Sequence, residues 1–296
     1  MKFKKIHIII NPAAGQEEPI LSYINKAFLD SGIDWEVSIT KQDNDASTFA
    51  KQWVDKVDVI AVYGGDGSIS EVARVLKGKN TPMAIIPGGT ANVISKELGI
   101  PQNTLEAIEL LKGANSEVIT VDMATNNGEL FLIRVNLGIM ADMVMEASRE
   151  LKDKLGQLAY GITAIQTMLK SDPMVYKMKI DNQEVVEEGV ALTITNCGNI
   201  GVGDYSFAPD ISIEDGFLDV ILLQQADLMS VLKIAGTTLM KTESEVLMHW
   251  KCKEIEISLD ATQKFILDDF ERETNFLHIK VLPNVLKVIV PLNIPK

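Results

Sequence analysis

The first part of the chain alternates between short apolar runs and segments whose apolar residues recur at helical spacing. The β-branched runs have the length of buried parallel strands, and a helical segment follows most of them. This alternation predicts a doubly wound α/β domain with a mostly parallel sheet over residues 1–122. The expected strands are 5–10, 33–40, 57–63, 82–87 and 117–121, and the expected helices are 20–28, 46–54, 68–76, 93–98 and 105–111.

Beyond residue 122 the pattern changes to short strands joined by turn residues, which indicates an antiparallel, β-rich domain over residues 123–283. Two helical insertions interrupt it, at 143–169 and 227–239. A last strand at 286–290 is expected to bring residues 284–296 back to the first domain. The other expected strands are 130–137, 175–180, 185–194, 218–223, 255–259, 264–267 and 277–281.

Hydrophobic content and net charge limit where the protein is located in the cell and what it binds. The 296 residues are 46% hydrophobic, but no stretch of about 18 apolar residues could span a membrane. The apolar run at 6–10 is too short for the core of a signal peptide, so we expect a cytoplasmic protein. The net charge of −13 argues against nucleic acid as a partner and leaves only transient, local contact with a bilayer. A homodimer is compatible with the sequence, although no feature decides the oligomeric state.

The cysteines and histidines give no sign of a metal centre or of thiol chemistry. There are two cysteines, Cys197 and Cys252, and three histidines, none at metal-ligand spacing. Zinc hydrolysis and thiol catalysis therefore have no support, and we interpret these five residues as structural.

Candidate chemistry begins at three turns rich in small residues. Gly64, Gly65 and Gly67 separate a buried strand from a helix, and similar turns follow the strands that end before Asn11 and Gly88. Glycine lets the backbone approach a ligand closely, and the start of a helix favours an anion. In a parallel sheet these turns share the carboxyl edge, where ligands bind.

Asp66 is unusual within a phosphate-binding turn, because a carboxylate repels phosphate unless a cation lies between them. A magnesium ion that arrives with a nucleotide would resolve this conflict. The alternative is an ordinary strand-to-helix turn in which Asp66 or Ser68 caps the helix. Thr90 is expected to cap the helix at 93–98. The methionine-rich segment at 143–169 is interpreted as core helices, with an adaptable wall for acyl chains as the alternative.

Taken together, five motifs resemble the diacylglycerol kinase catalytic-domain family, in particular its soluble bacterial lipid kinases, over nearly the whole chain. They occur in the same order as in the family. The motifs are Asn11-Pro12-Ala13-Ala14-Gly15, Gly64-Gly65-Asp66-Gly67-Ser68, Pro87-Gly88-Gly89-Thr90-Ala91-Asn92, residues 154–160, and the stretch from Pro209 to Val220.

The resemblance implies an α/β nucleotide domain, a β-sandwich-like lipid domain, and an active site between them. It implies ATP at the three turns, and it implies a structural magnesium ion held by the carboxylate of Asp215 and the carbonyls of Ser212 and Phe217. One carboxylate and several carbonyls suit a hard cation. The ATP contacts would come from Asn11, Pro12, Gly15, Thr40, Gly64, Gly65, Asp66, Gly67, Ser68, Ser70, Gly89 and Thr90.

The family's general base lies in an Asp-Gly-Glu motif, and here the corresponding stretch is Asp268-Asp269-Phe270-Glu271. Glu271 is the preferred base and Asp269 the second choice, with Phe270 in the place of the glycine. If that position needs a positive φ, Phe270 would be strained. Alternatively the register is shifted and Asp268 holds the first place, or the stretch is merely an acidic, solvated turn.

The predicted activity is transfer of the γ-phosphate from ATP, with magnesium, to the hydroxyl of a lipid alcohol such as diacylglycerol. Glu271 or Asp269 would take the hydroxyl proton, while Asp66 would lie near the magnesium ion on ATP. There is no Walker-type motif and no protein-kinase catalytic loop. Three alternatives stay open: another lipid, such as phosphatidylglycerol, a sphingoid base or a polyprenol; a soluble alcohol, as in NAD kinases and phosphofructokinases; or a non-catalytic nucleotide or lipid sensor.

Overall fold

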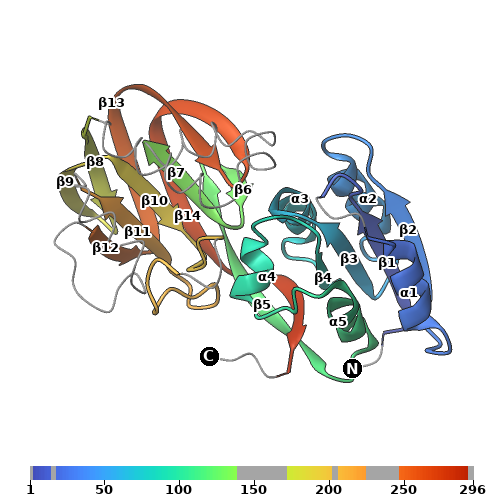
Figure 1. Cartoon of the computed structure of the whole chain (residues 1–296). Helices are drawn as coiled ribbons and strands as arrows, with labels where there is room; N and C mark the ends of the chain where they lie inside the picture. Colours follow the sequence, from blue (N-terminus) through green and yellow to red (C-terminus); the bar gives the residue numbers. More distant parts are fainter. Residues whose placement is uncertain (1–2, 15–17, 139–171, 202–205, 225–246, 293–296) are drawn as a thin grey trace.

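The computed structural model describes residues 3–14, 18–138, 172–201, 206–224 and 247–292. Both predicted helical insertions, at 143–169 and 227–239, lie outside these residues. Within the described residues, the strands form one hydrogen-bonded network that runs through an α/β part and a β-rich part (Figure 1).

The α/β part has a parallel sheet in the order β4-β3-β1-β2, as the alternating pattern predicts. Helices α1 and α5 pack together on one face, and α2 and α3 pack together on the other (Figure 1). The doubly wound prediction is thereby confirmed. The elements are β1 (Lys5–Ile10), α1 (Ile20–Phe28), β2 (Asp34–Ile39), α2 (Asp45–Trp53), β3 (Val59–Gly64), α3 (Asp66–Leu76), β4 (Met83–Pro87), α4 (Val93–Glu97), α5 (Thr104–Glu109) and the 3-10 turn η1 (Leu110–Lys112).

The β-rich part is antiparallel, and its strands form two layers around one core. The strand β13 bends where its register shifts between Ser258 and Gln263, so that its first half pairs with β8 and its second half with β7. The strands are β6 (Glu129–Phe131), β7 (Arg134–Gly138), β8 (Met174–Ile180), β9 (Gln183–Gly189), β10 (Ala191–Thr195), β11 (Leu218–Leu223), β12 (Leu247–Cys252) and β13 (Glu254–Leu267).

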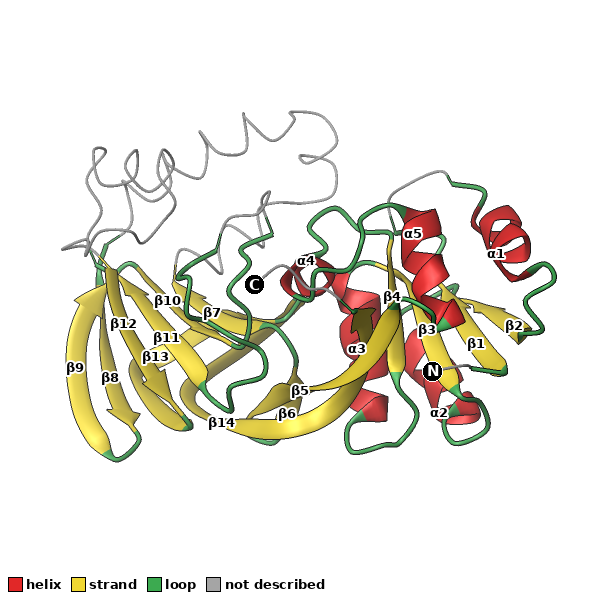
Figure 2. Cartoon of the chain, turned by 90° about the horizontal axis from the view of Figure 1, so that it is seen from below, coloured by secondary structure: helices red, strands yellow, loops and turns green. Residues whose placement is uncertain are grey.

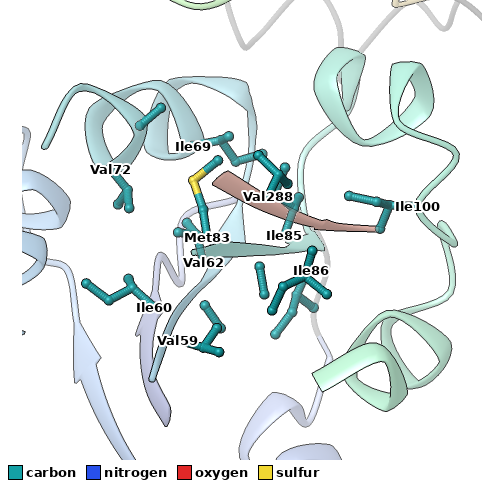
Figure 3. Close-up of a cluster of buried hydrophobic side chains, with 14 of the residues drawn as sticks. Val59, Ile60, Val62, Ile69, Val72, Met83, Ile85, Ile86, Ile100 and Val288 are labelled. Atoms are coloured by element: carbon teal, nitrogen blue, oxygen red, sulfur yellow. The ribbon is translucent and has the colours of Figure 1, made fainter. Parts of the chain in front are cut away.

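Two long strands, β5 (Ser116–Asn126) and β14 (Phe270–Pro291), connect the two parts (Figure 2). The start of β14 pairs with β13, and its end pairs with β5 and, at Val288, in parallel with Met83 of β4. Val288 therefore enters the core of the α/β part beside Met83, Ile69 and Ile85 (Figure 3).

Several strand boundaries differ from those expected. The predicted pairs 255–259 and 264–267, and 277–281 and 286–290, are each one strand, because irregular pairing bends β13 and β14 without ending them. Conversely, 130–137 and 185–194 each divide into two strands. The strand β12 was not predicted, since most of its residues are only partly buried and show no clean alternation.

The imidazole of His7 is buried in the α/β part. Its ring stacks on Trp53, with centroids 4.3 Å apart, and Nε2 lies 3.0 Å from Ser38 Oγ. Burial, and secondarily the charge of Lys5, lower the pKa of His7 to about 4. The folded protein therefore holds this ring in the neutral form.

Because the folded-state pKa of His7 is below its unfolded value of 6.5, the unfolded chain binds the proton more readily. Well above pH 6.5, His7 should have almost no effect on the free energy of unfolding. As the pH falls toward 4, the residue should lower that free energy progressively. Between pH 7 and pH 5 the expected loss is about 2 kcal/mol. Urea unfolding of wild type and His7→Phe, which keeps a ring on Trp53, measures this. Equal losses in both proteins would contradict the assignment.

Candidate functional site

Three turns meet at the carboxyl edge of the parallel sheet. The Asn11 amide donates to the carbonyl of Tyr63 at 2.9 Å, and the Gly88 amide donates to the carbonyl of Gly64 at 3.0 Å. The side chain of Asn11 donates from Nδ2 to Ser68 Oγ at 2.9 Å. The turns after β1, β3 and β4 therefore form one continuous backbone surface beside the N-terminus of α3.

The glycines in these turns are required by close backbone packing. A Cβ on Gly89 would lie 2.6 Å from the Cα of Gly65, and a Cβ on Gly64 would lie 2.9 Å from the Cβ of Ser68. Gly65 precedes α3 in an extended conformation, and no side chain caps that helix. The N-terminus of α3 is thus a place where backbone amides and the helix dipole favour an anion.

Asp66 caps a helix, but not the one it begins. Its carboxylate accepts hydrogen bonds from the amides of Val93 at 3.1 Å and Ile94 at 3.2 Å, at the start of α4. The expectation that Thr90 caps this helix is wrong: Thr90 is exposed, and the N-cap position belongs to Asn92. Burial raises the pKa of Asp66, and the two amide hydrogen bonds oppose that shift.

The other predicted nucleotide residues have varied surroundings. Thr40 is buried, and its amide donates to the carbonyl of Ile10 at 2.9 Å, so it adjoins the Asn11 turn. Ser70 is fully buried in α3, and its hydroxyl has no hydrogen-bond partner among the described residues. Pro12 is exposed, and Gly15 lies outside the described residues.

The acidic turn between β13 and β14 lies against the N-terminus of α3. A Cβ built on Gly67 would be 3.1 Å from Oδ2 of Asp269. This contact brings a carboxylate from the β-rich part to the glycine turn of the α/β part. It joins two sites that are about 200 residues apart in the sequence.

Asp268 holds this turn in place. Its buried carboxylate accepts the amides of Leu132, Ile133 and Arg134, with the shortest distance 2.8 Å from Ile133. Arg74 of α3 forms an ion pair with it at 3.4 Å, with the Asp268 side chain fully buried. One carboxylate thus links the turn, the start of β7 and α3.

Glu271 has different surroundings from Asp269. Its side chain is 49% exposed and forms an ion pair with Lys264 on the neighbouring strand at 2.7 Å. The expected strain at Phe270 is absent, because the left-handed residue is Asp268, with φ 53°. The two-residue turn is therefore Asp268-Asp269, with Phe270 the first residue of β14.

Two further charged residues near the site, the buried Arg134 and the partly buried Glu97, were not predicted from the sequence. Arg134 donates to the carbonyl of Asn199, and its guanidinium interacts electrostatically with Asp66, Glu97 and Asp268. Glu97 accepts the amide of Asn199 at 2.8 Å, and burial raises its pKa. Neither residue lies in a recognisable motif, since Arg134 interrupts an apolar strand and Glu97 ends a short helix.

At the predicted structural magnesium site, both carboxylate oxygens of Asp215 already accept hydrogen bonds from protein donors. Asp215 Oδ1 accepts the Phe217 amide at 3.0 Å, and Oδ2 accepts Lys251 Nζ at 2.9 Å. A divalent ion at Asp215 would have to displace the ammonium, so the residues as arranged do not fit the metal. Among the described residues, no group of three or more carboxylate, imidazole or thiol side chains could hold one.

Comparison with known proteins identifies the two parts separately. Residues 5–125 match the diacylglycerol kinase catalytic domain. Residues 134–290 match the YegS C-terminal NAD kinase beta sandwich-like domain, which covers more than half of the chain. The β-sandwich-like expectation for the second part is confirmed by this match and by its two-layered strands.

Whole-chain relatives agree with these matches. The chain is 27% identical to the diacylglycerol kinase of Bacillus subtilis, over 90% of this chain and 89% of that protein. It is 30% identical to an uncharacterized Synechocystis protein, over 98% of this chain and 71% of that one. A crystal structure of a diacylglycerol kinase from Bacillus anthracis superposes with a TM-score of 0.80 at 26% identity, covering 99% of each chain.

No described helix is long and apolar enough to cross a membrane. The order of the motifs, the shared two-part fold and the matches over both parts lead to one conclusion. The chain belongs to the diacylglycerol kinase catalytic-domain family and is a lipid kinase.

Proposed function

We propose that this lipid kinase transfers the γ-phosphate of ATP to the hydroxyl group of a lipid alcohol, with diacylglycerol as the first candidate and phosphatidic acid as the product. The observation that carries the proposal is the contact between Asp269 and Gly67, which sets a carboxylate beside a glycine-rich helix N-terminus. Kinases that transfer a phosphoryl group to an alcohol place such a carboxylate beside the phosphate-binding site, where it orients the hydroxyl and accepts its proton. The enzyme would work at a membrane surface from the cytoplasm.

The three turns would hold the phosphates of ATP through backbone amides. The packing of Gly65 against Gly89 supports this role, because it leaves no side chain between the two backbones. Asn11 and Ser68 would order the surface through their mutual hydrogen bond. Thr40, which adjoins the Asn11 turn, would lie near the nucleotide.

Asp66 is proposed as a positioning residue. Both of its oxygens accept amides of α4, so it holds that helix, and the Gly89 turn before it, against the glycine turn after β3. Magnesium would arrive with ATP and would supply charge neutralisation for the phosphates. This role differs from the place beside the magnesium ion on ATP that the sequence suggested for Asp66.

For the general base, the structure favours Asp269 over Glu271, which reverses the order suggested by the sequence. Asp269 lies at the glycine turn, whereas Glu271 is half exposed and paired with Lys264. In the proposed step Asp269 accepts the hydroxyl proton, the hydroxyl oxygen bonds to the γ-phosphorus, and the bond to the β-phosphate oxygen breaks to release ADP. A base of this kind contributes about 10²- to 10⁴-fold in rate.

The choice between the two carboxylates is tested by transfer of labelled γ-phosphate from ATP and magnesium to diacylglycerol in mixed micelles. Asp269→Asn should lower kcat by at least about 100-fold with little change in the KM for ATP. The kcat of Glu271→Gln should stay within a few fold of the wild-type value. Glu271 is half exposed, and its surface ion pair with Lys264 contributes little to stability.

If Glu271→Gln loses the activity while Asp269→Asn keeps it, the base assignment is wrong and the lipid-kinase proposal stands. A wild type that labels phosphatidylglycerol, a sphingoid base or a polyprenol would change only the acceptor. Labelling of a soluble alcohol alone, or ATP binding without turnover on any acceptor, would overturn the proposal.

The packing of the turns gives a second prediction. In Gly89→Ala the new Cβ would lie 2.6 Å from Gly65 Cα, so the two turns must separate, and the affinity for ATP should fall at least about tenfold. Gly65→Ala is the comparison, because its Cβ would make an ordinary 3.4 Å contact. Calorimetric titration with ATP and magnesium measures both. Wild-type affinity in Gly89→Ala would exclude these turns as the nucleotide site.

The role of Asp268 in holding the acidic turn gives a third prediction. Asp268→Asn replaces one acceptor oxygen by an NH₂ group that faces the amides of Leu132 to Arg134, and it removes the ion-pair partner of Arg74. The free energy of unfolding should fall by about 2 to 4 kcal/mol. Asp260→Asn is the control, since that carboxylate is 74% exposed and its ion pair, with Lys177, is at the surface. Equal midpoints of urea unfolding for the two variants would contradict the anchoring role.

A further inference from the structure

The side chain of Lys251 lies among the acidic residues that precede and begin β11. Lys251 of β12 donates from Nζ to Asp215 Oδ2 at 2.9 Å and to the carbonyl oxygen of Asp210 at 2.8 Å. The carboxylate of Asp210 is 3.8 Å from the same nitrogen. The ammonium therefore contacts one carboxylate oxygen and one carbonyl oxygen, with a second carboxylate nearby.

The pairing register of β11 and β12 places Lys251 beside these acidic residues. Lys251 is directly opposite Asp219 in the antiparallel pair of β11 and β12, so the two side chains lie on the same face. Asp219 is buried, and its Oδ1 is bound by His249 Nε2 at 2.6 Å. Burial alone lowers the pKa of Lys251, but Asp215, Asp219 and Asp210 together raise it, so the lysine stays charged.

The cluster is tied to the strands that join the two parts of the molecule. The Gly216 amide donates to Asp122 Oδ2 at 2.6 Å, and the Asp122 amide donates to the carbonyl of Ile213 at 2.8 Å. The other oxygen of Asp122 accepts the Asn284 amide at 2.7 Å. A cation at Asp215 therefore stabilises a loop that is bonded to both β5 and β14.

The atoms around the ammonium are those that a hard divalent cation would use. Carboxylate and carbonyl oxygens are the ligands of magnesium and calcium in proteins. They are equally good acceptors for the three N–H donors of a lysine. A lysine and a divalent ion cannot both occupy the same carboxylate oxygen, because two positive charges at contact distance repel strongly when partly buried.

We propose that Lys251 is a covalently attached replacement for a structural divalent cation. Its ammonium neutralises the negative charge of the loop from Asp210 to Phe217. This part of the enzyme therefore needs no metal ion for its stability. Removal of the ammonium leaves the same oxygens without a cation and converts the loop into a weak divalent-cation site. This inference does not depend on the identity of the phosphate acceptor or on the general base.

The experiment is thermal unfolding of the full chain without nucleotide, first in a chelator and then in rising MgCl₂ or CaCl₂ at constant ionic strength. Wild type should have the same midpoint throughout. Lys251→Met should unfold at a lower temperature in chelator and should recover about 2 to 4 °C with a divalent ion at about ten times its dissociation constant. Half of the recovery is expected near 1 mM, as for a site with few charged ligands.

Two further variants separate a cation site from a general effect of salt. Lys251→Arg keeps the positive charge and should resemble wild type. Lys251→Met combined with Asp215→Asn should not recover with either ion. The proposal is overturned if the wild-type midpoint falls in chelator and returns with magnesium, or if Lys251→Met folds but does not respond to a divalent ion. If Lys251→Met does not fold, Lys251→Gln replaces it in the same series.

Discussion

The buried carboxylate of Asp268 is the interaction on which the site depends. It accepts the consecutive amides of Leu132, Ile133 and Arg134, which lead into β7, and faces the guanidinium of Arg74 from α3. The three amides and the guanidinium come from different parts of the molecule, because Arg74 belongs to α3 of the α/β part. A buried carboxylate is costly to desolvate, so it is stable here only while all of these donors are present. The position of Asp269 beside Gly67 follows from this constraint.

Asp66 is likewise a buried carboxylate that accepts backbone amides from a distant segment. A carboxylate at the start of α3 would be expected to serve a ligand or its own helix, and the two oxygens of Asp66 accept the first amides of α4. Short helices gain little from their own hydrogen bonds, and α4 has five residues, so an external acceptor for its first amides matters. The two carboxylates together fix the glycine turns and the acidic turn against each other, with Arg134 as a shared buried counter-charge.

The long strands β5 and β14 explain how two differently built parts form one enzyme. The end of β14 contributes Val288 to the core of the α/β part, while its beginning carries the acidic turn. A single strand thereby connects the packing of one part to the chemistry at the edge of the other. The loop held by Lys251 is bonded to the same two strands through Asp122, so its charge balance affects the connection as well.

The sequence by itself determined the fold class, the family and the three small-residue turns. Strand length, helical spacing and glycine chemistry are local properties, and the order of motifs needs no coordinates. It also identified Asp215 and the stretch from Asp268 to Glu271 as acidic positions of interest. The boundaries of β13 and β14 could not be predicted, because a bend that keeps its pairing looks like a turn in the sequence.

Only the tertiary structure decided what each charged side chain contacts. Asp66 and Val93 are 27 residues apart, Arg74 and Asp268 are 194 apart, and Lys251 and Asp215 are 36 apart. No local pattern encodes such pairs, since they depend on sheet register and on which elements pack together. For that reason the sequence favoured Glu271 by its spacing, whereas the hairpin at Asp268-Asp269 turns Asp269 toward α3 and directs Glu271 to Lys264.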